Sequence, residues 1–205
     1  AFVAQSSASE NIGSFTFNAA RSFIAFIFLL VVIGIKSLIQ KSPSGTNRAN
    51  QSPVGFKKTL IAGTLCGIAL FTATNFQQFG IASYPDGVAS SGRAGFLTAT
   101  YVIMVALCAR FFGKKLHPMV WVATVSCIVG MYMLCMSGGI SGLYIGDLLL
   151  FLCAICFTCH ILIIDRFTYI DSMKMSCVQF LVCGILSAVG MLIFEHPTAA
   201  SLSSA

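Results

Sequence analysis

The sequence predicts an all-α, polytopic membrane protein in which the helices form a bundle across the bilayer. The first observation is composition: of 205 residues, 57% are hydrophobic and 9% are charged, whereas a soluble domain carries about a quarter charged residues. A chain this apolar cannot cover itself with solvated side chains, and disorder requires the opposite composition. The second observation is a series of uncharged runs, each close to the length of about 20 residues that a spanning helix needs.

These runs place six membrane spans along the chain. Segments such as FIAFIFLLVVIGI lack the alternation of apolar and polar residues that is typical of barrel strands, which favours helices. The connections between the runs are polar or carry turn residues, for example SPSG, SPVG and Pro85. We expect the spans near residues 15–35, 59–79, 87–110, 118–137, 146–164 and 175–194.

The third observation is where the charges lie. The net charge is +6, and basic residues favour cytoplasmic loops. If the sides of the membrane alternate from span to span, one side holds ten basic residues and no basic residue lies in the loops of the other. Residues 36–58 should therefore be cytoplasmic and residues 138–145 external, and the basic excess reflects topology rather than a surface for nucleic acid. The inner residues are Lys36, Lys41, Arg48, Lys57, Lys58, Arg110, Lys114, Lys115, Arg166 and Lys174, and the outer acids are Glu10, Asp86, Asp147 and Glu195.

Two arginines, Arg21 and Arg93, fall inside predicted spans. A charge there costs at least about 2.5–3.5 kcal/mol, so such a side chain faces the bundle interior or water, or it snorkels to the headgroups. Both alternatives are open for each arginine, and Arg21 could also pair with a neighbouring helix end. Arg93 lies among small residues in VASSGRAG, where a solute could approach, and a guanidinium binds carboxylate or phosphate with two hydrogen bonds.

Polar residues also follow helix faces. Thr64, Phe71, Asn75 and Gln78 share one face, Arg93, Thr100 and Tyr101 share another, and Ser176, Gln179, Cys183 and Ser187 share a third. They could bind a polar solute, or they could only form hydrogen bonds between helices. Gly63 and Gly67 are spaced for close helix packing. The candidates for the solute path are Arg21, Asn75, Gln78, Arg93, Thr100, Tyr101 and Gln179.

The segment CAICFTCH contains the C-x-x-C-H pattern of covalent haem attachment. It lies deep within a predicted span, where haem attachment would have no exposed segment and thiolates would lie in hydrocarbon. We therefore interpret Cys153, Cys156 and Cys159 as small packing residues. The sequence contains no acid pair at depth, no nucleophile elbow and no phosphate loop, so we predict no catalytic residue, cofactor, metal ligand or enzyme activity.

A weak internal repeat appears when residue 1 is placed over residue 159 without gaps. Each copy then reads as the end of a span, a polar connection and a span with an early polar residue, which is Arg21 in one copy and Gln179 in the other. The two full spans are five crossings apart, so the copies face opposite ways. Inverted repeats of this kind are common in secondary transporters.

The chain resembles the drug/metabolite transporter superfamily, specifically its EamA-like members. The resemblance is carried, in order, by FTFNAARSFIAF, NFQQFGIASYPDGVASSGRAGFLTATYVIMVAL, FFGKKLHPMVWVATVSCIVGMYML and GDLLLFLCAICFTCHILIIDRF, although Ala106 stands where many relatives have proline. It implies ten helices in two inverted five-helix repeats. Residues 1–137 would then be the first repeat without most of its first helix, and residues 138–205 the start of the second, truncated after two helices.

The resemblance implies a secondary active transporter that moves a small polar metabolite or drug by alternating access across the plasma (cytoplasmic) membrane of a bacterium. The alternative is a membrane-embedded receptor or scaffold without transport activity, and a membrane enzyme ranks third. The expected partners are the lipid bilayer and a small-molecule solute, with no nucleic acid and with a homodimer left open. The sequence does not identify the solute, the coupling ion, the direction of transport or the oligomeric state.

Overall fold

The computed structural model describes residues 13–39, 55–85, 90–113, 117–136 and 144–195, and these ranges contain helices and no strand. Every predicted span is confirmed as a helix, and the ends agree to within four residues. The helices are α2 (Ser14–Ile39), α3 (Phe56–Ala82), α4 (Ser90–Phe111), α5 (Met119–Met136), α6 (Ile145–Arg166) and α7 (Ser172–Phe194). Four of these helices, α2, α3, α6 and α7, run past the predicted spans because a helix continues through polar residues outside the hydrocarbon.

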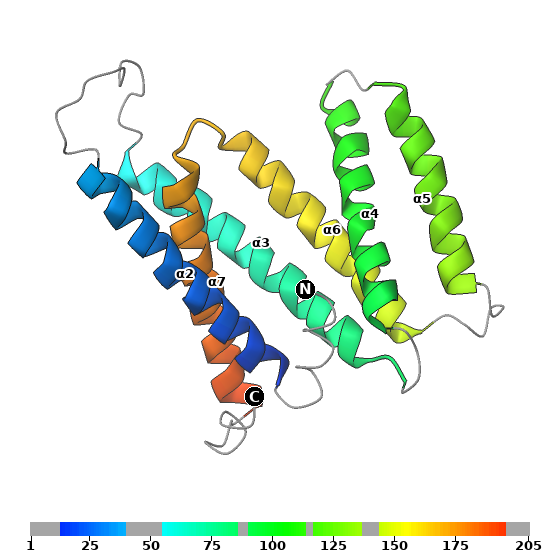
Figure 1. Ribbon diagram of the computed structural model, residues 1–205, viewed down its shortest axis with the longest axis horizontal. Coiled ribbons are helices and arrows are strands. Elements are labelled where there is room, and N and C mark those ends of the chain that lie inside the picture. Colours follow the sequence, from blue (N-terminus) through cyan, green and yellow to red (C-terminus); the bar gives the residue numbers. More distant parts are fainter. Residues whose placement is uncertain (1–12, 40–54, 86–89, 114–116, 137–143, 196–205) are drawn as a thin grey trace.

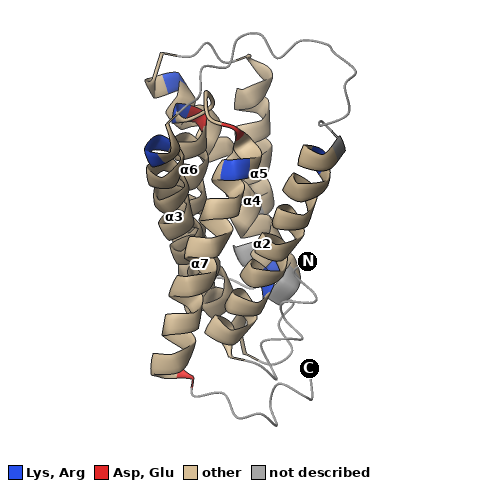
Figure 2. Cartoon of the chain, turned by 90° about the vertical axis from the view of Figure 1, so that its left-hand side faces the viewer, with Lys and Arg blue, Asp and Glu red and all other residues tan. Residues whose placement is uncertain are grey.

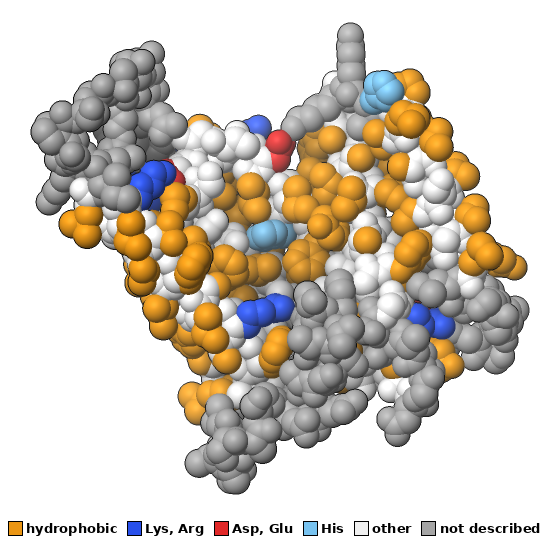
Figure 3. Space-filling model, viewed as in Figure 1, with side chains coloured by type: hydrophobic (Ala, Val, Ile, Leu, Met, Phe, Trp, Pro, Cys, Tyr) orange, Lys and Arg blue, Asp and Glu red, His pale blue; other side chains and the backbone are white. Residues whose placement is uncertain are grey.

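Five of these helices are long and apolar enough to cross a membrane, namely α2, α3, α4, α6 and α7. In α5 the apolar stretch found is shorter, Met119–Gly130. Large apolar side chains point outward, such as Phe28 at 65% exposure and Trp121 at 57%. Hydrophobic side chains are spread over the face seen in Figure 3, from α2 to α5. A surface of this kind is suited to lipid, and the chain is a multi-pass membrane protein.

Within the bundle, α3 packs against α6 and α7, α2 packs against α7, and α4 lies between α6 and α5 (Figure 1). Most of the described basic positions gather near one end of the bundle (Figure 2). Six of the ten residues predicted to be cytoplasmic lie in described helices, at or near their ends: Lys36, Lys57, Lys58, Arg110, Arg166 and Lys174. The other four, together with Glu10, Asp86 and residues 138–143, lie outside the described residues.

Glycines let α3 approach its neighbours closely. A Cβ added at Gly63 would lie 2.5 Å from the Cβ of Val178, and one added at Gly67 would lie 2.7 Å from the Cβ of Val182. The prediction that these two glycines serve helix packing is therefore confirmed, and their partner is α7. Close to the other end of α3, a Cβ added at Gly146 of α6 would lie 2.6 Å from the carbonyl oxygen of Gly80.

The helices α2 and α7 form an antiparallel pair. The register that places residue 1 over residue 159 also places Ser14 over Ser172, the first residues of the two helices. Lys36 Nζ donates to Met173 Sδ at 3.6 Å near one end, and Phe15 stacks on Phe194 with ring centroids 5.7 Å apart at the other. The same register carries Phe15 onto Met173 and Lys36 onto Phe194, so each contact is the image of the other.

Candidate functional site

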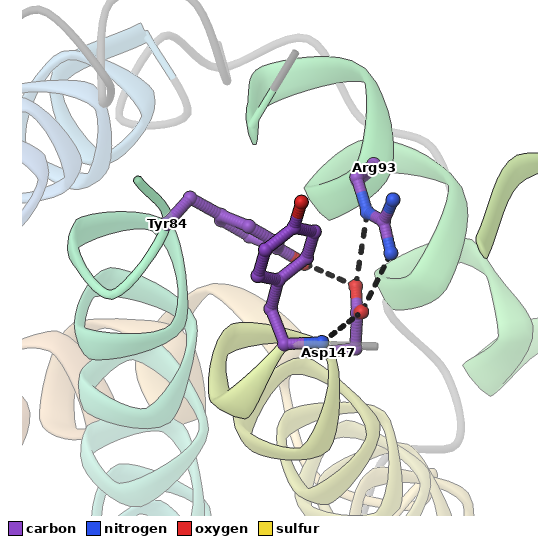
Figure 4. A network of polar contacts seen from close by, with 4 residues as sticks. Tyr84, Arg93 and Asp147 are labelled. Atoms are coloured by element: carbon purple, nitrogen blue, oxygen red, sulfur yellow. Dashed lines mark hydrogen bonds and ion pairs between the residues drawn. The ribbon is translucent and has the colours of Figure 1, made fainter. Parts of the chain in front are cut away.

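Arg93, in the first turn of α4, is buried, and two nitrogens of its guanidinium donate to the carboxylate of Asp147 in α6. Its Nη2 lies 2.6 Å from Oδ2 of Asp147 and its Nε lies 3.1 Å from Oδ1. Figure 4 shows the two side chains face to face, with Tyr84 approaching the same carboxylate. This bidentate geometry is what a planar guanidinium offers and an ammonium does not.

The carboxylate of Asp147 is fully engaged. Besides the two bonds from Arg93, it accepts one from the hydroxyl of Tyr84 through Oδ1 and one from the backbone N–H of Tyr144, at 3.0 Å, through Oδ2. Asp147 lies in the first turn of α6, where the positive end of the helix dipole favours an acid. Four donors and a helix N-terminus together stabilise a buried negative charge that would otherwise be costly.

Two tyrosine rings flank the ion pair. The guanidinium carbon of Arg93 lies 5.7 Å from the ring centroid of Tyr84 and 5.1 Å from that of Tyr144. The rings themselves meet edge to face at 5.7 Å. Burial raises the pKa of the Tyr84 phenol, and the hydrogen bond to Asp147 raises it further. The phenol therefore keeps its proton and remains a donor. Tyr84, Arg93, Tyr144 and Asp147 are called the outer clasp below.

The outer clasp differs from what the sequence alone indicates. Arg93 was expected either to line a solute path or to snorkel, and Asp147 only to mark the outer side of the membrane. The structure joins them in an ion pair that is 8% exposed at Arg93 and 6% exposed at Asp147. That Arg93 lines a solute path stays a prediction. The opposite charges of Arg93 and Asp147 near the predicted outer ends of two spans are the signal that could have suggested the pairing.

A second polar cluster joins α2 and α3 and contains two of the candidates, Arg21 and Asn75. Arg21 Nη2 donates to Oδ1 of Asn18 at 3.2 Å, and Asn18 Nδ2 donates to Oδ1 of Asn75 at 3.3 Å. Asn75 Nδ2 then donates to the backbone oxygen of Phe71 at 2.7 Å. Asn18 is completely buried, so this is an internal chain of hydrogen bonds.

A third contact lies between α6 and α7. Nε2 of His160 and Oε1 of Gln179 are 3.3 Å apart, and both residues are buried. The sequence singled out Gln179 but considered His160 only as part of the cysteine motif. In the register that places residue 1 over residue 159, Gln179 falls over Arg21.

The remaining candidates are Gln78, Thr100 and Tyr101. Gln78 is fully buried in α3, Thr100 Oγ1 lies 3.9 Å from Cys127 Sγ of α5, and the Tyr101 ring lies 5.7 Å from that of Phe157 in α6. The structure thus divides the predicted path residues among several places. In the part of the chain that the structure describes, no three His, Cys, Asp or Glu side chains are grouped to hold a metal ion.

One contact at the outer end was not predicted at all. Glu195, at the end of α7, accepts hydrogen bonds from the backbone N–H groups of Phe15 at 2.6 Å and Thr16 at 2.8 Å, and from the Thr16 hydroxyl at 2.7 Å. The first N–H groups of a helix have no partner within it. A carboxylate from α7 therefore caps α2.

Comparison with known proteins agrees with this architecture. The sequence profile of the EamA-like transporter family matches residues 1–136. An uncharacterized transporter from Archaeoglobus fulgidus is 28% identical over 167 residues, which cover 81% of this chain and 44% of that protein. The chain thus spans less than half the length of this relative. No solved structure matches the chain.

Proposed function

We propose, from the premise that the chain belongs to the EamA-like transporter family, that it is part of a secondary active transporter that works by alternating access. The family and the archaeal relative support a membrane transporter, and they favour a non-enzymatic protein. The finer proposal is that a small polar metabolite or drug crosses the plasma membrane at the interface between two inverted repeats. The end of the bundle that carries most basic residues would face the cytoplasm.

The proposed repeats are residues 1–137 and 138–205, in a ten-helix architecture of which this chain supplies six described helices. The observation that carries the proposal is the match of the family profile to residues 1–136. The antiparallel packing of α2 on α7 agrees with an inverted arrangement, and inverted repeats commonly meet at the solute site of secondary transporters. The family profile ends at residue 136, one residue before the proposed boundary, and this also supports the division.

Polar burial favours a solute path over a scaffold that only packs. Asn18 and Gln78 are completely buried, and Asn75 and Gln179 are 7% exposed. Amide groups of this kind are costly in hydrocarbon unless they are hydrogen-bonded, and small residues alone suffice for packing. We place the path beside Arg21, Asn75, Gln78 and Gln179, with Arg93, Thr100 and Tyr101 toward α4.

Flux through the full-length protein tests the proposal. The protein would be reconstituted in liposomes and tested for uptake of a panel of radiolabelled amino acids, organic acids, nucleosides and cationic drugs, with protein-free liposomes as the control. We expect saturable uptake of at least one class, reduced in the variant Gln179→Leu. A correctly inserted protein that moves none of these solutes would favour the receptor or scaffold alternative.

A further inference from the structure

The feature that carries a further inference is Arg21, a cation within a span. It lies seven residues after Ser14, the first residue of α2, which corresponds to about 10 Å of helix rise. The side chain is half-buried. A charge at this depth is costly and needs compensation from the bundle interior, from water or from a partner.

The described partners of Arg21 supply little of that compensation. Its Nη2 donates one hydrogen bond to Asn18, and its guanidinium carbon lies 5.7 Å from the ring centroid of Phe17. A guanidinium has five N–H donors. Arg93 pairs with Asp147, whereas the described contacts of Arg21 include no carboxylate. Within the part of the chain that the structure describes, the two intramembrane arginines therefore differ: Arg93 is bound to an acid, whereas Arg21 donates a single hydrogen bond.

The contacts around Arg21 hold it in place. Asn75 accepts from the amide of Asn18, and this leaves the Asn18 carbonyl oxygen directed to Arg21. Asn75 is fixed in turn by the backbone oxygen of Phe71. Each donor has one acceptor, so donation begins at the guanidinium of Arg21 and ends at the backbone oxygen of Phe71. A side chain that only reached for the membrane surface would not require a buried pair of asparagines behind it.

We infer that Arg21 binds the anionic group, a carboxylate or a phosphate, of the transported solute. The inference rests on the proposed transport function. Two oxygens of such a group match two N–H donors of a guanidinium and supply the missing charge. A lipid phosphate offers the same chemistry, so the experiment must separate a solute from a headgroup.

The test is thermal unfolding of the purified full-length protein in dodecyl maltoside, a detergent without phosphate. The probes are benzoate and inorganic phosphate, and neutral benzamide is matched in shape to benzoate. We expect benzoate or phosphate, and not benzamide, to raise the unfolding temperature of the parent. Arg21→Gln should weaken the apparent affinity by about tenfold or more, as expected for the loss of hydrogen bonds to a charged group.

Two further variants control for charge and for folding. Arg110→Gln removes the same charge from an exposed position at the far end of α4 and should bind like the parent. Arg21→Lys keeps the charge without the paired donors and should bind weakly even where it folds normally. Equal stabilisation by benzoate and benzamide, or unchanged binding in Arg21→Gln, would overturn the inference. So would stabilisation by added phosphatidylglycerol alone, because that outcome makes Arg21 a lipid anchor.

The flux assay separates this inference from the proposed function. If the protein moves only neutral or cationic solutes, and Arg21→Gln moves them equally well, the anion inference fails while transport stands. If the protein binds benzoate through Arg21 but moves no solute at all, the transport proposal fails and an anion-binding site is left.

Discussion

Asp147 accepts hydrogen bonds from Nη2 of Arg93 at 2.6 Å and from its Nε at 3.1 Å. This pair connects the N-terminus of α6 to that of α4. In the proposed division of the chain, α4 belongs to the first repeat and α6 to the second. One ion pair therefore spans the repeat boundary at the outer end. Under alternating access, the outer side could open only if this contact moved as a unit or broke.

Asp147→Asn should destabilise the protein, because it leaves the charge of Arg93 buried without its partner. Removal of one member of a buried ion pair typically costs about 3–5 kcal/mol. The measurement is the free energy of unfolding in mixed micelles. The matched control is Asp171→Asn, at an exposed position, because Asn replaces Asp as a helix cap with little loss. Arg93→Lys should also lower stability and transport while the protein still inserts. A variant Arg93→Lys that matches the parent in both would indicate that Arg93 is only an interfacial anchor.

The outer clasp also predicts a dependence on alkaline pH. Burial and the bond to Asp147 raise the pKa of Tyr84 above its ordinary value, which is about 10. Above about pH 10 the folded state keeps the Tyr84 proton, whereas the unfolded state loses it. The contribution of Tyr84 to the free energy of unfolding is therefore complete below about pH 10 and is lost as the pH rises toward the pKa of the folded state. Above about pH 10 the parent should lose stability more steeply than Tyr84→Phe. Parallel slopes in the two proteins would contradict this.

Sequence alone predicts the helices well because each helix is a local property of an uncharged run. The polar contacts are different in kind. Arg93 meets Asp147 across 54 positions, and Thr16 meets Glu195 across 179. Those pairings depend on which helices are neighbours, and six apolar segments of similar composition do not specify this. His160 was missed for the same reason, since its partner Gln179 lies on another helix.

Gly63→Ala should weaken the packing of α3 on α7. The added Cβ would lie 2.5 Å from that of Val178, and overpacking of this kind costs about 1–3 kcal/mol. Gly34→Ala is the control, because no heavy atom lies within 4 Å of its added Cβ, and there a helix gains up to about 1 kcal/mol. The measurement is again unfolding in mixed micelles. If Gly63→Ala were as stable as Gly34→Ala, the close contact would not determine how α3 packs on α7.

Sidedness can be tested at two exposed positions. Ser83 follows α3 at the outer end of the bundle, and Phe112 follows α4 at the basic end; both are exposed. On a background with the nine native cysteines replaced, an impermeant maleimide should label Ser83→Cys from outside the cell. It should label Phe112→Cys only after the membrane is opened. The reverse pattern would invert the proposed topology.

Glu195→Ala should fray the start of α2, although Glu195 and the first residues of α2 lie at opposite ends of the described sequence. The carboxylate accepts from the N–H groups of Phe15 and Thr16, and a cap of this kind contributes about 0.5–2 kcal/mol. Glu195→Gln should cost less, since it keeps one acceptor oxygen and loses the favourable charge at the helix N-terminus. Hydrogen exchange of the two amides measures the effect.

The matched control is Asp171→Ala. Asp171 directly precedes α7 and caps it by accepting a hydrogen bond from the N–H of Met173 at 3.0 Å. Faster exchange should then appear at the start of α7 and not at Phe15 or Thr16. If Glu195→Ala left both amides of α2 protected, water or another group would be the cap. Glu195 would then not stabilise the start of α2, and the outer clasp would be the charged contact that connects helices at this end of the bundle.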